Sequence, residues 1–285
     1  MPATLGYKGR KSGLFCGRLC GLFLTAAAGS GPAWSLDCSG FALGAQAGVT
    51  RSVWEETSAL GSLLVRERGT LRRTAITAEE TCALWQWRLT LARSTGARAY
   101  DGVSNTSAPI QTRSALTITD TSAQAWTPAM SGWSGGLRLN HRKIDRTIAG
   151  TGRVLGYPER FSYWQAAAGL RQELALGPGL VVSGDAWLGG GPAGKMALQL
   201  PNADATELTL GSSRVAEIGL QIGSAPSAPN QTGWSWHARV DYQWQHMAAG
   251  PARALMRNGI PVGGAAQPAT RQQTAGLGAA IQYRF

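Results

Sequence analysis

The sequence predicts an all-β chain that crosses a membrane as an antiparallel up-and-down β-barrel. Three observations support this fold class. Apolar and polar residues alternate along many short segments, charged residues make up only 15% of the chain, and tryptophan is abundant, with 11 residues. Alternating segments of about ten residues cross an outer membrane as tilted strands. No long apolar run follows the first 35 residues, so a helical membrane protein is not expected.

Residues Gly233 to His246, GWSWHARVDYQWQH, show the alternation most clearly. Every second side chain from Trp234 to Trp244 is apolar or aromatic, and the side chains between them are mostly polar or charged. Because successive strand side chains point to opposite faces, one face of this segment is wholly apolar. We interpret that face as lipid-facing. The alternative, a soluble β-sandwich, would not be expected to gather its rings into two belts.

Ten segments of this kind are expected as strands. In chain order they cover residues 41–54, 63–71, 85–92, 111–120, 132–143, 164–176, 180–188, 216–222, 233–246 and 275–285. An even number suits a bacterial single-chain barrel. Eight or twelve strands are the alternatives, because the second and fourth segments are weakly patterned.

The spacing of the segments predicts loops that alternate between short and long. The turn Gly177–Gly179 is very short, whereas Ile144–Arg160, Gly190–Gly211 and Met247–Gln273 are long. Long loops lie outside in such barrels, so the chain is expected to end on the periplasmic side. Most rings then fall at one interface, as an aromatic belt requires. The rings on that side are Trp85, Trp87, Trp133, Trp234, Trp236, Tyr283 and Phe285, and Trp164 and Trp244 lie at the opposite rim.

The first 35 residues are expected to be a secretory signal peptide. They contain a basic start, an apolar stretch from Leu19 to Ala28, and the small-x-small sequence Ala33–Trp34–Ser35. Its removal takes away four basic residues and no acidic ones, which lowers the formal charge from +11 to +7 and leaves residues 36–285 as the barrel. The alternatives are an ordinary N-terminal helix, or cleavage after Ala28.

Two cysteines, Cys38 and Cys82, lie outside the expected signal peptide. An even pair in an oxidising compartment is a candidate disulfide, and two free thiols are the alternative. Cys38 precedes the first expected strand and Cys82 the third, so both are expected at the periplasmic rim. A bridge between them would have to span the second strand.

The C-terminal segment AGLGAAIQYRF, Ala275 to Phe285, resembles the last strand of bacterial outer-membrane β-barrel proteins. Those proteins end in an alternating strand whose terminal aromatic residue is read by the barrel-assembly machinery. The resemblance implies that Tyr283 and Phe285 form an assembly signal. It also implies the outer membrane of a Gram-negative bacterium as the location, with outer-membrane lipid and lipopolysaccharide as partners. It leaves the activity open.

Charged residues on the inward faces of the segments are expected to form a network in the lumen. A ten-stranded barrel is too narrow for a porin-type channel once such side chains fill it. Unpaired buried charges are costly, so we expect these residues to pair and plug the lumen, with an ion pathway as the alternative. The set is Arg88, Arg138, Arg171, Glu173, Asp185, Glu217, Arg239, Asp241 and Arg284.

The long segment around residues 142–160 is expected to be a basic surface loop that binds anions. Lipopolysaccharide phosphates, or another surface polyanion, are the expected ligands. A rim that is merely solvated is the alternative. The expected anion-binding residues are Arg142, Lys143, Arg146, Arg153 and Arg160, and the loop Met247–Gln273 adds Arg253, Arg257 and Arg271.

No catalytic, metal or cofactor site is expected from the sequence. The omptin surface proteases, which also have ten strands, carry an Asp pair and an Asp–His pair at the outer mouth, and no matching motif is present. Lipid A deacylases and outer-membrane phospholipases resemble each other in a lumen-external His with Ser two residues later, but His141 is followed by Arg142 and Lys143. His141 and His246 are therefore interpreted as interfacial, and His237 as inward-facing near the periplasmic end.

The function expected from the sequence is that of a non-enzymatic outer-membrane barrel with a charge-plugged lumen, whose basic surface loops contact lipopolysaccharide or an external ligand. The alternatives are a small solute or ion channel, and an omptin-like or lipid-modifying envelope hydrolase that uses loop carboxylates such as Asp101, Asp145 and Glu159. A monomer is expected. Nucleic acid is not an expected partner, because the basic residues are divided between lumen and loops.

Overall fold

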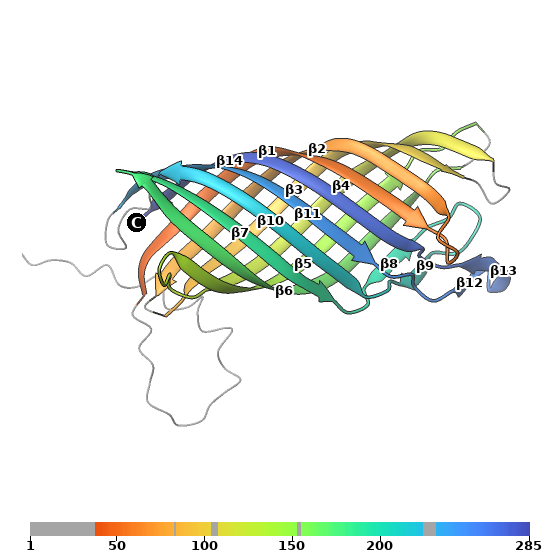
Figure 1. Cartoon of the computed structure of the whole chain (residues 1–285). Coiled ribbons are helices and arrows are strands. Elements are labelled where there is room, and N and C mark those ends of the chain that lie inside the picture. Colours follow the sequence, from red (N-terminus) through yellow and green to blue (C-terminus); the bar gives the residue numbers. More distant parts are fainter. Residues whose placement is uncertain (1–37, 83, 104–107, 153–154, 225–231) are drawn as a thin grey trace, which may run out of the picture. The chain divides into compact units, whose positions relative to one another are not determined.

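The computed structural model describes residues 38–82, 84–103, 108–152, 155–224 and 232–285 (Figure 1). The expected signal peptide and Arg153 lie outside these residues. The described residues form strands, turns and loops. Among them there is no helix of the length and apolar character needed to cross a membrane.

Ten strands form a closed antiparallel barrel, which confirms the predicted fold class. The sheet runs in the order β5-β4-β3-β2-β1-β14-β11-β10-β7-β6, and pairing between β5 and β6 closes it (Figure 1). The strands are β1 (Cys38–Thr57), β2 (Leu63–Cys82), β3 (Gln86–Val103), β4 (Pro109–Trp126), β5 (Trp133–Ile148), β6 (Tyr157–Gly177), β7 (Leu180–Gly191), β10 (Ser213–Ser224), β11 (Gly233–Met247) and β14 (Ala269–Arg284).

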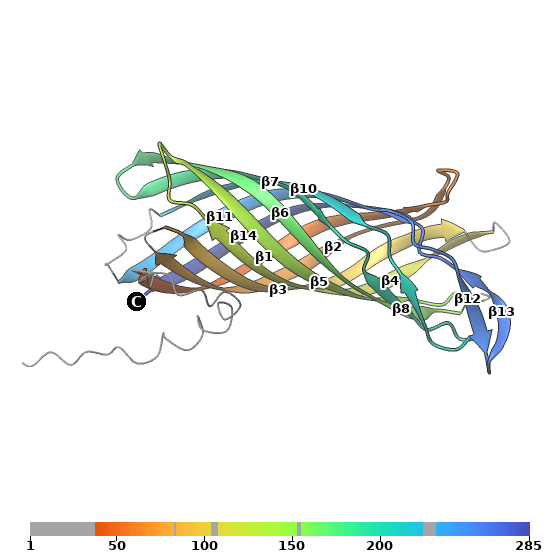
Figure 2. The same ribbon diagram turned by 90° about the horizontal axis from the view of Figure 1, so that it is seen from below.

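The two ends of the barrel differ in their connections. One end, here called the C-terminal rim, holds Phe285 and short turns such as that between β6 and β7, where Gly179 has a φ of 80°. The other end, here called the hairpin rim, carries the two longest connections between barrel strands, residues 192–212 and 248–268, each of which forms a small hairpin (Figure 2). These hairpins are β8 (Lys195–Leu198) with β9 (Thr206–Thr209), and β12 (Arg253–Arg257) with β13 (Ile260–Ala265).

The outer surface of the barrel carries the predicted apolar band. Large apolar side chains are exposed there because alternate residues of every strand point away from the lumen. The exposed members include Leu43, Val49, Ile76, Trp87, Leu89, Leu91, Trp133, Leu137, Leu139, Trp164, Leu170, Leu188, Ile218, Leu220, Trp234, Trp236, Val240, Tyr242, Leu277, Ile281 and Phe285. Such a surface is stable only against lipid, as the sequence pattern indicated.

Several strands are longer than the sequence predicted. β2 continues to Cys82 instead of ending near Leu71, and β6 begins at Tyr157 instead of Trp164. The reason is that backbone pairing continues beyond the apolar band, where outward residues become polar and the hydrophobic alternation fades. The expected loop Ile144–Arg160 was therefore wrong: β5 continues to Ile148, and only residues 149–156 connect the two strands.

Candidate functional site

The half of the lumen next to the C-terminal rim contains a polar cavity of about 280 Å³. It extends from Gly233 at that rim to Leu71 and Ile118 near the middle of the barrel. The structure places all nine inward charges expected from the sequence around this one cavity. They are Arg88, Arg138, Arg171, Glu173, Asp185, Glu217, Arg239, Asp241 and Arg284.

Most of these charges form ion pairs with one another. The nitrogen–oxygen distances are 3.0 Å for Arg138–Glu217, 3.2 Å for Arg171–Glu173 and 2.9 Å for Arg239 Nη2–Asp185 Oδ1. Asp241 lines the cavity, but within the described part of the chain no cationic group lies within 4.0 Å of it. The first pair joins β5 with β10 and the third joins β11 with β7, whereas Arg171 and Glu173 both lie on β6.

Glu79 is a lumen charge that the sequence analysis missed. Its carboxylate oxygen Oε2 lies 2.8 Å from Arg88 Nη2, and its Oε1 lies 4.0 Å from Arg284 Nη2. Glu79 therefore joins two of the predicted arginines. Glu79 has the same parity as Leu71 on β2, which would have marked it as inward. The expected end of the second strand at Leu71 removed it from consideration.

Two indole rings also project into this half of the lumen, here called the lower half, and contact its arginines. Trp126 and Trp187 meet edge to face, with ring centroids 4.5 Å apart. The guanidinium of Arg171 lies 4.6 Å from the Trp126 ring, and that of Arg138 lies 4.6 Å from the Trp187 ring. These stacked cations are held by the ring faces as well as by carboxylates. Gly169 makes room for Trp187, since a Cβ there would be 2.5 Å from the ring.

The half of the lumen toward the hairpin rim, here called the upper half, is filled with buried apolar side chains. Trp54 and Phe161 cross this region with ring centroids 5.5 Å apart. The β8–β9 hairpin, which pairs with the part of β6 nearest the hairpin rim, adds Met196, Leu198 and Leu208 to the layer, and Leu210 directly after β9 adds a fourth side chain. The buried layer comprises Trp54, Leu71, Leu116, Ile118, Ile144, Phe161, Tyr163, Met196, Leu198, Leu208, Leu210 and Met247.

A buried ionic cluster lies within this apolar half. Arg146 contacts Glu159 at 2.6 Å and Glu56 at 2.9 Å. Arg98 contacts Glu67 at 3.4 Å, and neither of these two side chains has exposed surface. Both guanidinium groups also lie within 6 Å of the Trp54 ring, at 5.7 Å for Arg98 and 5.4 Å for Arg146. The cluster therefore ties β1, β2, β3, β5 and β6 together.

The expected anion-binding loop does not exist as one surface. Arg142 and Arg146 lie on β5 with side chains inside the barrel, where Arg142 binds Asp120 at 2.6 Å. Lys143 is exposed on the outer face of β5, and Arg160 is exposed on β6 but bound to Asp145 at 2.6 Å. Continued strand pairing beyond the apolar band explains this correction, because alternation sends every second residue into the lumen.

Exposed arginines lie instead on the outward faces of β1, β2 and β3. Arg51, Arg68, Arg72 and Arg93 form what is here called the arginine row. Arg51 is directly opposite Thr70, so Arg68 and Arg72 are its diagonal neighbours on β2, and Arg93 is the diagonal neighbour of Arg72 on β3. Within the residues that the structure covers, no carboxylate lies within 4.0 Å of these four guanidinium groups.

The arginine row borders the apolar band. Val49 and Leu91, each two residues nearer the C-terminal rim than Arg51 and Arg93, are both 47% exposed. Toward the hairpin rim, the outer surface becomes ionic, and Glu55 binds Arg66 at 2.7 Å and Arg271 at 2.6 Å. The row therefore lies at the boundary between the apolar band and the ionic part of the outer surface.

The three histidines occupy the faces that the sequence predicted. His141 and His246 point outward near the hairpin side of the apolar band, and His237 lines the lower cavity. His246 stacks on Trp244 with ring centroids 6.2 Å apart. His141 stacks on Trp164 at 4.5 Å and has a further polar partner, Ser162, on the neighbouring strand.

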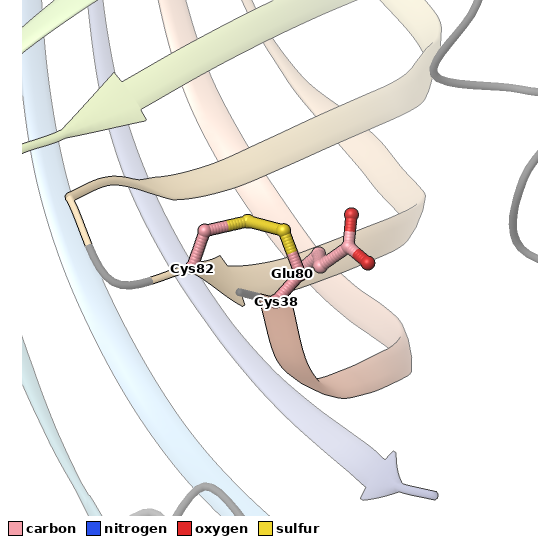
Figure 3. Close-up of side chains that lie close together, drawn as sticks. All are labelled: Cys38, Glu80 and Cys82. Atoms are coloured by element: carbon pink, nitrogen blue, oxygen red, sulfur yellow. A yellow bond between two sulfur atoms is a disulfide. The ribbon is translucent and has the colours of Figure 1, made fainter. Parts of the chain in front are cut away.

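Cys38 and Cys82 are joined by a disulfide at the C-terminal rim (Figure 3). They are directly opposite each other on β1 and β2, so the bond connects neighbouring strands instead of spanning a strand between them. The sequence predicts an intervening strand because the apolar alternation of the second strand fades near Leu71, whereas β2 continues to Cys82. Glu80 lies beside the bond, but sulfurs that are bonded to each other do not provide thiolate ligands for a metal (Figure 3).

Comparison with solved structures gives the same fold. The outer-membrane protease OmpT from Escherichia coli is similar over 86% of this chain and 97% of its own, with a TM-score of 0.54 and 10% identity. Two other solved structures are more distant. Neisserial surface protein A has a TM-score of 0.38 and 10% identity over 87% of this chain and 99% of its own. The translocator domain of the autotransporter NalP from Neisseria meningitidis has a TM-score of 0.39 and 13% identity over 87% of this chain and 89% of its own. No protein-family model and no curated protein matches the sequence.

The predicted resemblance to bacterial outer-membrane β-barrels is thereby confirmed at the level of the fold. At 10% identity, the similarity to a protease carries no information about activity.

Proposed function

We propose that this protein is an outer-membrane barrel that does not conduct and that binds lipopolysaccharide on its outer surface through the arginine row. The C-terminal rim would face the periplasm, and the hairpin rim the outside. The observation that carries the proposal is the contrast between the two surfaces of β1–β3. The inner surface is largely filled and most of its charges are paired, whereas the outer surface presents unpaired guanidinium groups beside lipid-facing residues.

The sealed lumen is supported by the order in which polar and apolar groups fill it from one rim to the other. An ion entering from the C-terminal rim would first meet the charges around the polar cavity. It would then meet the buried hydrogen-bonded groups of Arg142 and Tyr163, at and beyond the inner end of the cavity, and then the apolar layer. Arg142 Nη1 donates across the lumen to the side-chain oxygens of Gln243 and Gln245, at 3.1 and 3.2 Å. These bonds occupy polar groups that could otherwise hydrate a passing ion. Moving a charge through a dry apolar layer is costly, so the layer acts as an electrical barrier.

Lipopolysaccharide is favoured as the ligand because its chemistry matches the row. Its phosphate groups lie just above its acyl chains, at the level where Arg51 and Arg93 lie above Val49 and Leu91. Guanidinium groups bind phosphate oxygens through paired hydrogen bonds. The diagonal spacing of the four arginines allows two neighbouring side chains to hold one phosphate.

Single-channel conductance tests the sealed lumen. We expect the refolded chain to be silent in planar bilayers, and the Phe161→Gly variant with Ile144→Ala to leak, because it opens the apolar layer. Arg171→Ala with Glu173→Ala, which changes only the lower cavity, should stay silent. Steady conductance by the wild type would overturn the sealed lumen and favour the small-channel alternative.

Binding to lipopolysaccharide tests the arginine row. We expect Arg51→Gln, Arg72→Gln and Arg93→Gln together to weaken binding by at least about tenfold, equivalent to about 1.4 kcal/mol. The effect should shrink at high salt and with dephosphorylated lipid A. The comparison variant removes the same charge elsewhere, at the exposed residues Arg113, Arg253 and Arg257, of which the last two are the loop residues that the sequence predicts to bind anions. Equal losses for both triple variants would contradict a specific site.

A further inference from the structure

A serine and a histidine form a hydrogen-bonded pair on the outer face of the barrel. Ser162 lies on β6 and His141 on β5, and the distance from Ser162 Oγ to His141 Nε2 is 3.0 Å. The two residues are far apart in sequence and meet because β5 and β6 close the barrel. Their outward parity places the pair on the surface instead of in the lumen.

The local packing holds the histidine ring in place. Trp164 is directly opposite His141, and the two rings stack with an interplanar angle of 29° and centroids 4.5 Å apart. Stacking restricts rotation of the imidazole and keeps Nε2 directed at Ser162. A base whose orientation is fixed beside a hydroxyl is the arrangement that activates a serine nucleophile.

The pair lies at the level where acyl chains meet polar headgroups. On the side of the C-terminal rim, Leu139 is 48% exposed and Trp164 is 52% exposed, as expected of lipid-facing residues. On the side of the hairpin rim, the exposed ion pair of Asp145 and Arg160 marks the polar zone. An ester carbonyl of a membrane lipid lies at this same boundary.

Two lysines flank the serine along the sheet. Lys143 on β5 and Lys195 on β8 are each directly opposite Ser162 in the strand register. Lys195 binds Glu207 at 3.0 Å, whereas for Lys143 no carboxylate of a described residue lies within 4.0 Å. The ammonium group of Lys143 is therefore available to stabilise negative charge that develops next to Ser162 Oγ.

We propose that Ser162 and His141 form a lipid-facing acyl-ester hydrolase site, with acyl esters of outer-leaflet lipids as substrates. Ser162 Oγ attacks the ester carbonyl carbon while His141 Nε2 takes the hydroxyl proton, and the ammonium of Lys143 stabilises the oxyanion. The ester C–O bond then breaks, and the leaving alcohol takes the proton from His141. Water, deprotonated by His141, attacks the acyl-serine and releases a fatty acid, which regenerates the serine.

This activity goes beyond the proposed function and does not depend on it. No serine lies two residues after His141 in the sequence, because its hydroxyl partner, Ser162, lies on another strand. His246 provides the internal comparison: it is also outward-facing and stacked on a tryptophan, but it is paired in the sheet with Arg271 and Arg214.

The test measures fatty acid release by the refolded full chain in two kinds of vesicle, one of phosphatidylethanolamine and one that also contains lipopolysaccharide. Mass spectrometry of the released acids identifies which lipid is cleaved. We expect Ser162→Ala to abolish release and His141→Asn to lower it by at least about 100-fold. The control His246→Asn should retain wild-type activity. Electrophoretic mobility with and without heating shows that each variant is folded.

A second readout does not depend on the natural lipid. A fluorophosphonate with a long alkyl chain should bond to Ser162 Oγ with loss of fluoride, and peptide mapping should locate the adduct there. His141→Asn should prevent labelling, whereas His246→Asn should not. Release without dependence on Ser162, or a wild type that neither releases fatty acid nor becomes labelled, would overturn the proposal.

Discussion

In the lower half of the lumen, Arg138 and Glu217 retain 12% and 13% of their side-chain exposure, whereas Arg98 and Glu67 in the upper half retain none. Both halves pair their charges, but they do so in different surroundings. The lower pairs surround a polar cavity, so water can solvate a group that loses its partner. The upper pairs lie among apolar side chains, where water does not readily solvate a charge that loses its partner. The same kind of ion pair should therefore matter more in the upper half.

The largest effect is expected from Arg146→Met in the upper cluster. It removes the guanidinium but keeps much of the volume, and it leaves Glu56 and Glu159 buried without their cation. We expect the free energy of unfolding to fall by about 3–5 kcal/mol, measured by urea titration of the refolded protein. Arg160→Met removes an exposed pair on the neighbouring strand and should change it little. Similar losses in both variants would contradict the comparison.

The disulfide at the C-terminal rim should have the next largest effect. Cys38→Ser together with Cys82→Ser releases a cross-link between residues 44 positions apart. We expect a loss of about 2–4 kcal/mol in the same titration. Reduction of the wild type should reproduce this loss. An unfolding midpoint that does not respond to reductant would show that the bond does not constrain the barrel.

A packing change in the lower half should cost less than either. In Gly169→Val the new side chain would meet the Trp187 ring and displace it from Arg138. We expect a loss of about 1–3 kcal/mol, with an altered near-ultraviolet circular dichroism signal from the paired indoles. Gly184→Val is the control, because the nearest atom to a Cβ at Gly184 is 3.9 Å away. An unchanged indole signal in Gly169→Val would exclude the steric role.

The smallest effect is expected from Arg171→Ala with Glu173→Ala. Glu173 is 38% exposed at the side chain, so water replaces much of the lost pairing. We expect a loss of no more than about 1 kcal/mol, including the contact of Arg171 with Trp126. A loss as large as that for Arg146→Met would mean that the lower half is as dry as the upper half.

The inward charges show how much of the candidate site could be predicted. Alternation assigned nine residues to the lumen from parity alone, and all nine line one cavity. Parity did not assign Glu79, Arg98 and Arg146 to the lumen, because the sequence predicts loops, or strands that end too early, at these positions. The parity rule applies to them equally, but strand ends are visible in sequence only where outward residues are apolar. Beyond the apolar band, that signal disappears while backbone pairing continues.

The outer surface shows the opposite limit. Parity correctly placed His141 outward, but no pattern in the sequence connected it with Ser162, because their contact depends on the register between β5 and β6. The arginine row has the same origin. Arg51, Arg72 and Arg93 lie more than twenty residues apart in succession, and only the pairing of β1, β2 and β3 makes them neighbours.

By itself, the sequence determined the period-two alternation, and with it the expectation of ten strands, the face of each residue within the alternating segments and the need for lipid on the outside. These follow from local geometry, since neighbouring side chains along a strand must point to opposite faces. The tertiary structure decided which strands end where, which charges pair and which polar groups meet across strands. Those depend on register, which is set by the closure of the whole barrel and by the filling of its lumen.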